Sequence, residues 1–284
     1  EFLMKQIKIK SYAKLNLSLN IVGKTSHLHK IESVVAFASL HDEIFINKIK
    51  SKSHNISFFG KFSRNISNNN TVSKLLKILE KKKLLKDTKF KISINKKIPM
   101  KAGLGGGSMN AANILKFFIK KKFFRISKKE TEVISKNIGS DVILGINSSS
   151  SILNSKNKIK NFSNCEKFYT LIVKPNFGCS TKDIYAKVKK FDKPQIINPV
   201  KSMFDLNHLK KMNNSLEKIS LSKYPSLKSI KLYLEGLSDQ VFVRMTGSGS
   251  ALVVYFQTKE RCLNAKKLFS KKYKNYWCKA SKTI

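Results

Sequence analysis

The sequence predicts an α+β fold of two parts, because strand-like and helix-like apolar patterns are mixed along its 284 residues without strict alternation. Apolar and polar residues alternate at several places, and short β-branched runs bounded by Gly, Pro or Asn occur in both halves. Strands are expected at 6–10, 15–21, 43–46, 90–94, 169–173, 241–244, 251–256 and around 276–277.

Apolar residues at helical spacing predict the helices that accompany these strands. Val72, Leu75, Leu76 and Leu79 mark one helix, with Asn70 or Thr71 placed to cap it. A second follows a glycine-rich segment with Ala111, Ile114, Leu115 and Phe118 on one face. Further helices are expected at about 131–137, ending at a left-handed Gly139, over 227–234, ending at Gly236, and from about Lys259.

The serines at 148–151 and the Asn/Lys-rich run through Asn164 indicate a surface connection near a domain boundary. We therefore expect an N-terminal domain over residues 4–155 and a C-terminal domain over 156–284. No run of about 18 apolar residues could span a membrane, and no stretch resembles a signal peptide, so we expect a cytoplasmic protein without a membrane partner.

The net charge is +40, from 57 basic and 17 acidic residues. Only four of the basic residues are arginines, and the lysines are spread over every segment together with abundant Asn and Ile. A nucleic-acid-binding protein usually favours arginine and concentrates its charge on one face. We therefore favour codon bias as the origin of the charge and expect no specific nucleic-acid partner.

The metal-ligating residue types give no metal-binding pattern. Cys165, Cys179, Cys262 and Cys278 form no C-x-x-C pair, and His27 and His29 lack partners at ligand spacing. We expect free thiols and no metal site built from side chains.

A glycine-rich segment between the strand at 90–94 and the next helix is the most informative feature. Four glycines, Gly103 and Gly105 to Gly107, fall within five positions. The unpaired N–H groups of a helix N-terminus favour anions there. The segment is neither a Walker A motif nor the dinucleotide-binding pattern, so the prediction is a phosphate site of another kind.

Three other segments are weaker candidates. Lys14 and Asn16 share one face of a strand, although the residues alone favour a solvated edge lysine. Asp141 follows a helix stop and precedes an apolar run read as a strand, where it could lie at a pocket edge or in a turn. The small-residue loop 246–250 is either a long hairpin or a second close backbone approach to a ligand.

Taken in chain order, these segments resemble the GHMP kinases, a superfamily of small-molecule kinases. The resemblance rests on Ala13 to Leu17, on Pro99 to Ala112, on Ile138 to Val142 and on Met245 to Gly249. It implies an N-terminal domain of the ribosomal-protein-S5-like domain 2 type and a ferredoxin-like α/β C-terminal domain. The triple glycine is typical of the branch that phosphorylates the 2-hydroxyl of a diphosphocytidyl sugar alcohol.

The resemblance also implies roles for individual residues, with ATP and Mg²⁺ as cofactors. Asp141 is expected to act as the base, and Lys14 to stabilise the carboxylate and the developing alkoxide. Asn16, His29, Tyr185, Gly247 and Ser248 are expected to bind the substrate, with His29 on cytosine and Tyr185 stacked on it. ATP is expected at Pro99, Met100, Lys101, Ala102, Gly103, Leu104, Gly105, Gly106, Gly107, Ser108 and Met109.

Two positions depart from the family's pattern. Leu28 replaces an aromatic residue expected to stack on cytosine, and Met109 replaces a common second serine. The remaining interpretations are a homoserine- or mevalonate-type kinase of the same superfamily, or a basic nucleic-acid-binding protein on a kinase-like fold. A monomer or homodimer is expected.

Overall fold

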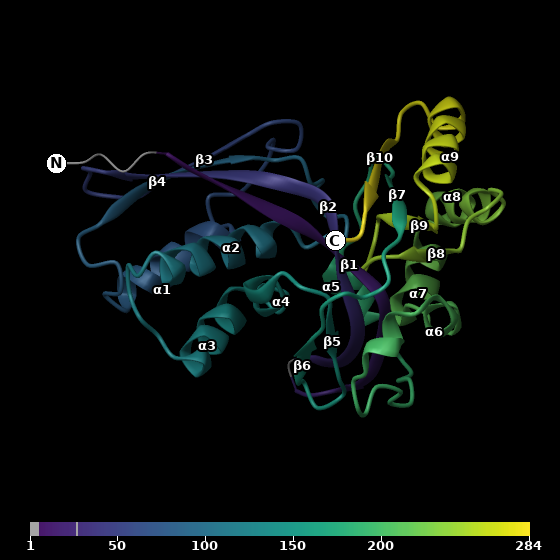
Figure 1. Cartoon of the computed structure of the whole chain (residues 1–284), viewed down its shortest axis with the longest axis horizontal. Helices are drawn as coiled ribbons and strands as arrows, with labels where there is room; N and C mark the ends of the chain where they lie inside the picture. Colours follow the sequence, from purple (N-terminus) through teal and green to yellow (C-terminus); the bar gives the residue numbers. More distant parts are fainter. Residues whose placement is uncertain (1–5, 27) are drawn as a thin grey trace. The chain divides into compact units, whose positions relative to one another are not determined.

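The computed structural model describes residues 6–26 and 28–284 of the chain (Figure 1). Two sheets and accompanying helices confirm the α+β prediction. The chain divides into two compact units, the first made of residues up to 13, 41–99 and 105–148, the second of 14–40, 100–104 and 149–284. The long strands β1 (Ile7–Lys24) and β2 (His29–Ile49), which pair with each other, run through both units. The domain boundary at 155/156 stays a prediction.

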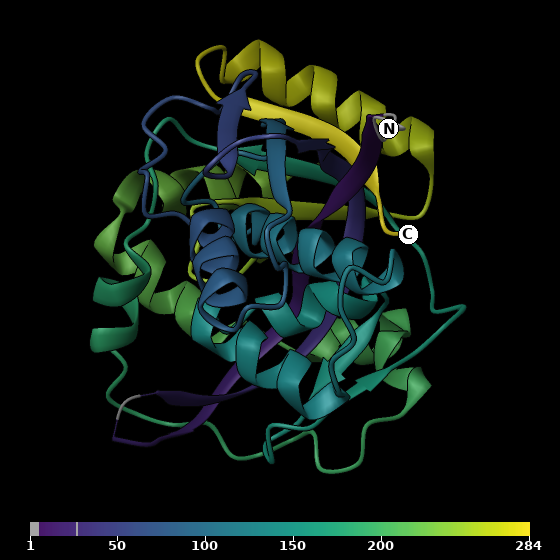
Figure 2. The ribbon, with the colours of Figure 1, turned by 90° about the vertical axis from the view of Figure 1, so that its left-hand side faces the viewer.

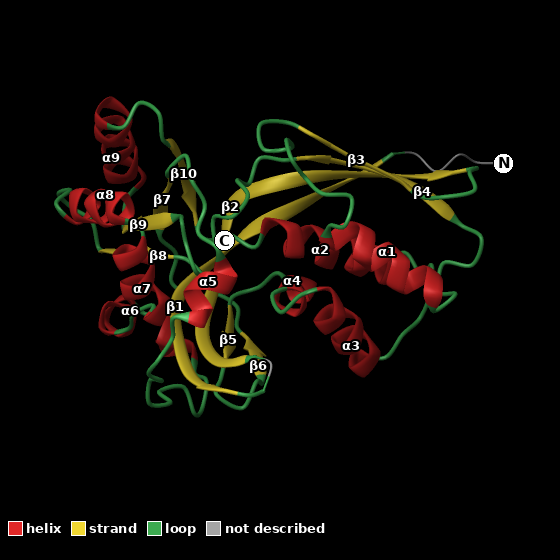
Figure 3. Cartoon of the chain, turned by 180° about the vertical axis from the view of Figure 1, so that it is seen from behind, coloured by secondary structure: helices red, strands yellow, loops and turns green. Residues whose placement is uncertain are grey.

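The first unit packs helices against one face of a sheet (Figures 1 and 3). The later part of β2 pairs antiparallel with β4 (Lys89–Asn95), and β3 (Asn55–Phe59) pairs parallel with β4. Side chains such as Ile44, Ile92, Leu76 and Phe118 fill the layer between sheet and helices. The helices are α1 (Thr71–Lys81), α2 (Gly106–Lys120), α3 (Lys128–Ile138) and α4 (Val142–Asn147).

The second unit contains an antiparallel sheet in the order β10-β7-β9-β8. Its strands are β7 (Tyr169–Lys174), β8 (Phe242–Met245), β9 (Leu252–Phe256) and β10 (Trp277–Lys282). In Figure 2, the yellow helix α9 (Lys259–Lys272) runs beside the yellow strand β10. The other helical segments are α5 (Thr181–Ala186), η1 (Lys201–Phe204), α6 (Leu206–Lys211), α7 (Ser215–Lys223) and α8 (Pro225–Glu235).

The core of the second unit joins an N-terminal segment of the chain to residues of its second half. Leu19 and Ile21 of β1 belong to one buried cluster with Leu171, Val254 and Phe269. The short strand β5 (Ser151–Leu153) pairs with β2 and with β6 (Ile159–Asn161). The sequence analysis expected a surface connection here; residues 156–158, 160–161 and 163–164 are exposed, but the segment also contains this hairpin, which was not predicted.

The predicted cap of the first helix is confirmed. The Asn70 side-chain oxygen accepts hydrogen bonds from the backbone N–H groups of Val72 and Ser73, both at 3.0 Å. The Asn70 N–H in turn donates to the Ser73 hydroxyl at 3.0 Å, which completes a capping box.

Three local predictions were wrong. The strands expected at 6–10 and 15–21 are one continuous strand, β1. Gly139 ends α3 with φ 171°, an extended rather than a left-handed conformation. The apolar run after Asp141 forms the short helix α4 and not a strand, because a short apolar run carries no periodicity that separates the two.

Candidate active site

The glycine-rich segment ends at the N-terminus of helix α2. Gly105 is the N-cap residue and has a left-handed backbone, φ 66° and ψ 12°. It has no side chain with which to cap the helix, so it offers the first-turn N–H groups no side-chain acceptor. The helix itself starts at Gly106, inside the glycine cluster. The predicted anion site therefore coincides with a helix N-terminus that a negative group can complete.

Residues 100–104 of the glycine-rich segment belong to the second unit, where the loop between β8 and β9 holds them. Gly103 has φ 74°, and a Cβ atom there would lie 2.0 Å from the carbonyl oxygen of Thr246. The Ser250 and Ala251 N–H groups donate to the carbonyls of Lys101 and Ala102, at 3.3 Å and 3.2 Å. The loop thus forms the expected hairpin and packs closely on the backbone of residues 101–103, while its approach to a ligand stays a prediction.

Lys14 and Asn16 form a buried polar pair on β1. Each side chain is 3% exposed, so the interpretation of Lys14 as a solvated edge lysine was wrong. The Lys14 ammonium donates to the Asn16 amide oxygen at 2.7 Å, which confirms that the two side chains share a face. Among the described lysines, only Lys14 and Lys96 are buried. Burial of a lysine is costly unless it is paired, so this position is a strong candidate for chemistry.

Asn16 connects this pair to the small-residue loop 246–250 between β8 and β9, called the late loop from here on. Its amide oxygen also accepts from the Gly247 N–H at 3.0 Å, and its amide nitrogen donates to the Ser33 hydroxyl at 2.8 Å. The Thr246 hydroxyl accepts from the Asn16 N–H at 3.0 Å. Thr246 lies outside the set of residues predicted from the sequence, although its position in a small-residue loop offered a signal.

A second residue supports the loop and was not predicted as a site residue. Asn214 donates through its amide nitrogen to the carbonyls of Met245 and Gly247, at 2.7 Å and 2.8 Å. Ser248, predicted to bind substrate, is 6% exposed, and its hydroxyl lies 2.9 Å from that of Thr181. The late loop is therefore fixed through both backbone and side-chain contacts.

Asp141 lies in the first unit, at the N-terminus of α4. Gly139, two residues earlier, lies next to the first turn of α2, since a Cβ atom there would be 3.6 Å from the Ser108 hydroxyl oxygen. The Asp141 carboxylate makes no capping hydrogen bond to α4. Within this unit, the predicted base and the predicted phosphate site are thus carried by neighbouring segments.

Met109 points into the interior rather than toward the loop. Its side chain is fully buried, and a Cβ atom at Gly145 of α4 would lie 2.9 Å from its sulfur. Met109 therefore packs α2 against α4. This contact places Met109 against the helix that follows Asp141.

His29 and Tyr185 come together in the second unit. Their ring centroids are 5.1 Å apart with a 52° angle between the planes, and the Phe191 ring lies 6.5 Å from His29. Partial burial, and secondarily the charge of Lys24, lower the pKa of His29 from 6.5, so the imidazole is neutral at pH 7. Phe191, 48% exposed, was missed by the sequence analysis, and Leu28 is 69% exposed. His27 lies outside the described residues.

The candidate residues divide between the units. Asp141, Pro99 and Gly105 to Met109 belong to the first, and the remaining predicted residues belong to the second. Within the second unit, Asn16 contacts both Lys14 and Gly247, and His29 and Tyr185 form a separate ring pair. Their assignment as site residues stays a prediction.

Two negative findings concern the part of the chain that the structure describes. No three His, Cys, Asp or Glu side chains there lie close enough to hold a metal ion together. No described helix has the length and apolar character needed to cross a membrane.

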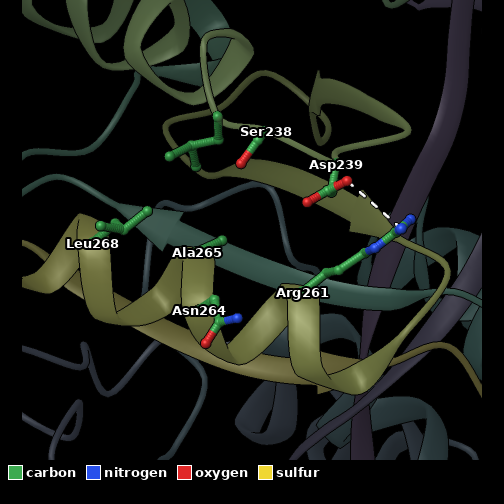
Figure 4. Close-up of a pocket in the computed structure, with 7 residues that line it drawn as sticks. Ser238, Asp239, Arg261, Asn264, Ala265 and Leu268 are labelled. Carbon is green, nitrogen blue, oxygen red and sulfur yellow. Dashed lines mark ion pairs between the residues drawn. The ribbon is translucent and has the colours of Figure 1, made fainter.

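A small pocket of the second unit holds none of the candidate residues (Figure 4). It has a volume of about 80 Å³ and lies between α9 and the segment before β8. Arg261 and Asp239 form an ion pair of 3.6 Å at its edge, and both side chains are about half exposed. We assign this pocket no part in the candidate site.

Comparison with known proteins gives consistent results over the whole chain. The family described as "GHMP kinases N terminal domain" matches residues 70–154. The 4-diphosphocytidyl-2-C-methyl-D-erythritol kinase of Pelagibacter ubique (strain HTCC1062) is 55% identical, covering 99% of this chain and 100% of that protein. The enzyme of the same name from Clostridium tetani (strain Massachusetts / E88) is 32% identical, with coverages of 98% and 100%. A crystal structure of 4-(cytidine 5'-diphospho)-2C-methyl-D-erythritol kinase shares the fold, with a TM-score of 0.78, 20% identity and coverages of 98% and 100%.

Proposed function

The chain belongs to the family of 4-diphosphocytidyl-2-C-methyl-D-erythritol kinases, and from this membership we propose the reaction that it catalyses. In this reaction the γ-phosphoryl group of ATP is transferred to the 2-hydroxyl of 4-diphosphocytidyl-2-C-methyl-D-erythritol. The observation that carries the proposal is the buried pair of Lys14 and Asn16, joined to the late loop through Gly247.

Phosphoryl transfer asks a protein mainly for alignment and for stabilisation of charge. We assign the triphosphate to the N–H groups in the first turn of α2, where Gly105 leaves the helix end uncapped by a side chain. Asp141 accepts the proton of the acceptor hydroxyl, and Lys14 stabilises the alkoxide that forms. The bond between the acceptor oxygen and the γ-phosphorus forms as the bond to the β,γ-bridging oxygen breaks.

Mg²⁺ fits this assignment because it usually binds through substrate phosphates and only one or two protein oxygens. A cluster of three carboxylates or histidines is therefore not required, and none is found among the described residues. Ser108, in the first turn of α2, is the hydroxyl within the predicted phosphate site that could contact the ion. When bound, the ion would neutralise charge on the phosphoryl oxygens of ATP.

The ring pair of His29 and Tyr185 supports a site for the cytosine base. A neutral imidazole has one donor and one acceptor nitrogen, which can pair with the polar edge of a base. An aromatic ring beside it provides a stacking face. The lowered pKa of His29 keeps the imidazole in this neutral form at pH 7.

A coupled assay of ADP formation tests the proposal. We expect turnover with 4-diphosphocytidyl-2-C-methyl-D-erythritol and none with homoserine or mevalonate at equal concentration. Turnover with only one of the latter two would contradict the proposed acceptor and leave the kinase assignment intact. The cytoplasmic location, the monomeric or homodimeric state and the lack of a specific nucleic-acid partner stay predictions.

A further inference from the structure

A buried carboxylate of the first unit, Asp42 on β2, has no part in the proposed reaction. Its side chain is fully buried. Its Oδ1 atom accepts hydrogen bonds from the N–H groups of Lys97 and Ile98, both at 2.8 Å. Its Oδ2 atom accepts from the Lys96 ammonium and from the Asn110 amide nitrogen, the latter at 3.0 Å. The two carboxylate oxygens of Asp42 therefore accept hydrogen bonds from four donors.

These donors lie on both sides of the glycine-rich segment along the chain. Residues 96–98 directly precede Pro99, and Asn110 directly follows Met109 on α2. The held residues also contact the start of the helix. A Cβ atom at Gly106 would lie 3.0 Å from Ile98 Cγ2 and 3.3 Å from Lys96 Nζ. One carboxylate thus fixes the approach to the segment and the helix that leaves it.

The charges explain why a carboxylate is needed at this position. The Lys96 ammonium is 4% exposed and lies beside the positive end of the α2 dipole. A cation there is unfavourable without a compensating negative charge, and an amide at position 42 provides none. Asn110, 1% exposed, presents an N–H that the same carboxylate accepts.

We propose that Asp42 is a positioning residue for the triphosphate. It holds residues 96–98 and the first turns of α2 in one arrangement, so that the N–H groups of the helix N-terminus are oriented before ATP binds. The inference rests on the proposed function, because it takes the first turn of α2 as the triphosphate site.

The variant Asp42→Asn separates the two halves of this arrangement. Its remaining oxygen can still accept from Lys97 and Ile98, whereas its amide nitrogen cannot accept from Lys96 or Asn110. Loss of hydrogen bonds to a charged group corresponds to a change of about 10-fold to 100-fold in affinity. We expect the Kd of MgATP, measured by calorimetry, to rise by that factor, with the KM of the acceptor substrate changed by less than about threefold.

Two further measurements separate positioning from a merely structural role. Hydrogen exchange without ATP is expected to be faster at residues 96–110 in Asp42→Asn. The double variant Asp42→Asn/Asn110→Asp restores a carboxylate opposite an amide and is expected to recover most of the ATP affinity. The adjacent Glu43→Gln is the control, because the Glu43 carboxylate contacts the side chains of Lys8, Asn95 and Lys97 at the sheet surface.

Unchanged ATP affinity in folded Asp42→Asn overturns the inference. So does an equal loss for both substrates without rescue in the double variant. Should Asp42→Asn not fold, Asn110→Ala removes only the contact to α2 and is expected to weaken ATP binding about threefold to tenfold, with no change counting against the inference. Absence of ATP-dependent turnover in the wild-type protein contradicts the proposed function, while the exchange experiment still tests the arrangement.

Discussion

The substitution Gly103→Ala, which adds a single methyl group, is expected to lower both stability and activity. Its φ of 74° is unfavourable for any residue with a Cβ, at a cost of about 1–2 kcal/mol. The added Cβ would also lie 2.0 Å from the Thr246 carbonyl oxygen and 2.9 Å from its carbon. These are backbone atoms, so no side chain can rotate away, and the overlap adds about 1–3 kcal/mol. We therefore expect Gly103→Ala to lower the free energy of unfolding by about 2–5 kcal/mol.

The same substitution should reduce activity, because the displaced residue contacts the proposed catalytic pair. The Thr246 hydroxyl accepts from the Asn16 N–H, and Asn16 accepts from the Lys14 ammonium. A shift of Thr246 by a fraction of an ångström disturbs both bonds. We expect kcat at saturating substrates to fall by at least about 10-fold, which corresponds to loss of about one hydrogen bond to a charged group.

Urea unfolding followed by circular dichroism measures the first effect, and the coupled assay measures the second. Gly236→Ala is the matched control, since Gly236 has φ −82° and its added Cβ would lie 3.6 Å from the nearest carbonyl oxygens. That variant is expected to be neutral or more stable by about 0.4–1 kcal/mol. A Gly103→Ala protein within about 0.5 kcal/mol of the wild type would refute the steric argument.

Three other predictions address the proposed chemistry. Asp141→Asn should lower kcat by at least about 100-fold through loss of the base, with the KM of ATP nearly unchanged in steady-state kinetics. The control is Asp239→Asn, which changes an exposed aspartate in an ion pair and should keep kcat within about twofold. Leu28→Tyr should lower the KM of the acceptor about twofold to tenfold by adding a stacking ring near His29, and an unchanged KM would argue against a base at that place. Because burial lowers the pKa of His29 from 6.5, the imidazole is protonated only as the pH falls below that value. The KM of the acceptor should therefore rise at low pH, and His29→Gln should remove this pH dependence. If the pH dependence remains in that variant, it belongs to another group.

Local sequence patterns predicted those elements that carry local signals. The apolar spacing of Val72 to Leu79 and the cap at Asn70 are both present in α1. β1 was divided in two because Ser11 to Lys14 interrupt the alternation of apolar and polar residues that marks 6–10 and 15–21. The period-two pattern by which strands are recognised is absent from these four residues, although the strand continues through them.

The candidate site was predicted less completely, since its contacts join residues far apart in the chain. The contact of Gly103 with Thr246 spans 143 residues, and the single sequence contains no signal for it. The burial of Lys14 could not be predicted from the sequence, because lysine is abundant throughout this chain and no local pattern distinguishes a buried one. Its importance, and the pairing of His29 with Tyr185, came from the resemblance to a family.

The two compact units interleave along the chain, which passes from one to the other five times between residues 13 and 149. Leu19 and Ile21 are made early during synthesis, yet their buried neighbours Leu171, Val254 and Phe269 belong to the last 114 residues. During synthesis, Leu19 and Ile21 therefore lack these buried neighbours until most of the chain has been translated. The order of synthesis therefore cannot be the order of folding for the second unit, and no single cut releases either unit whole.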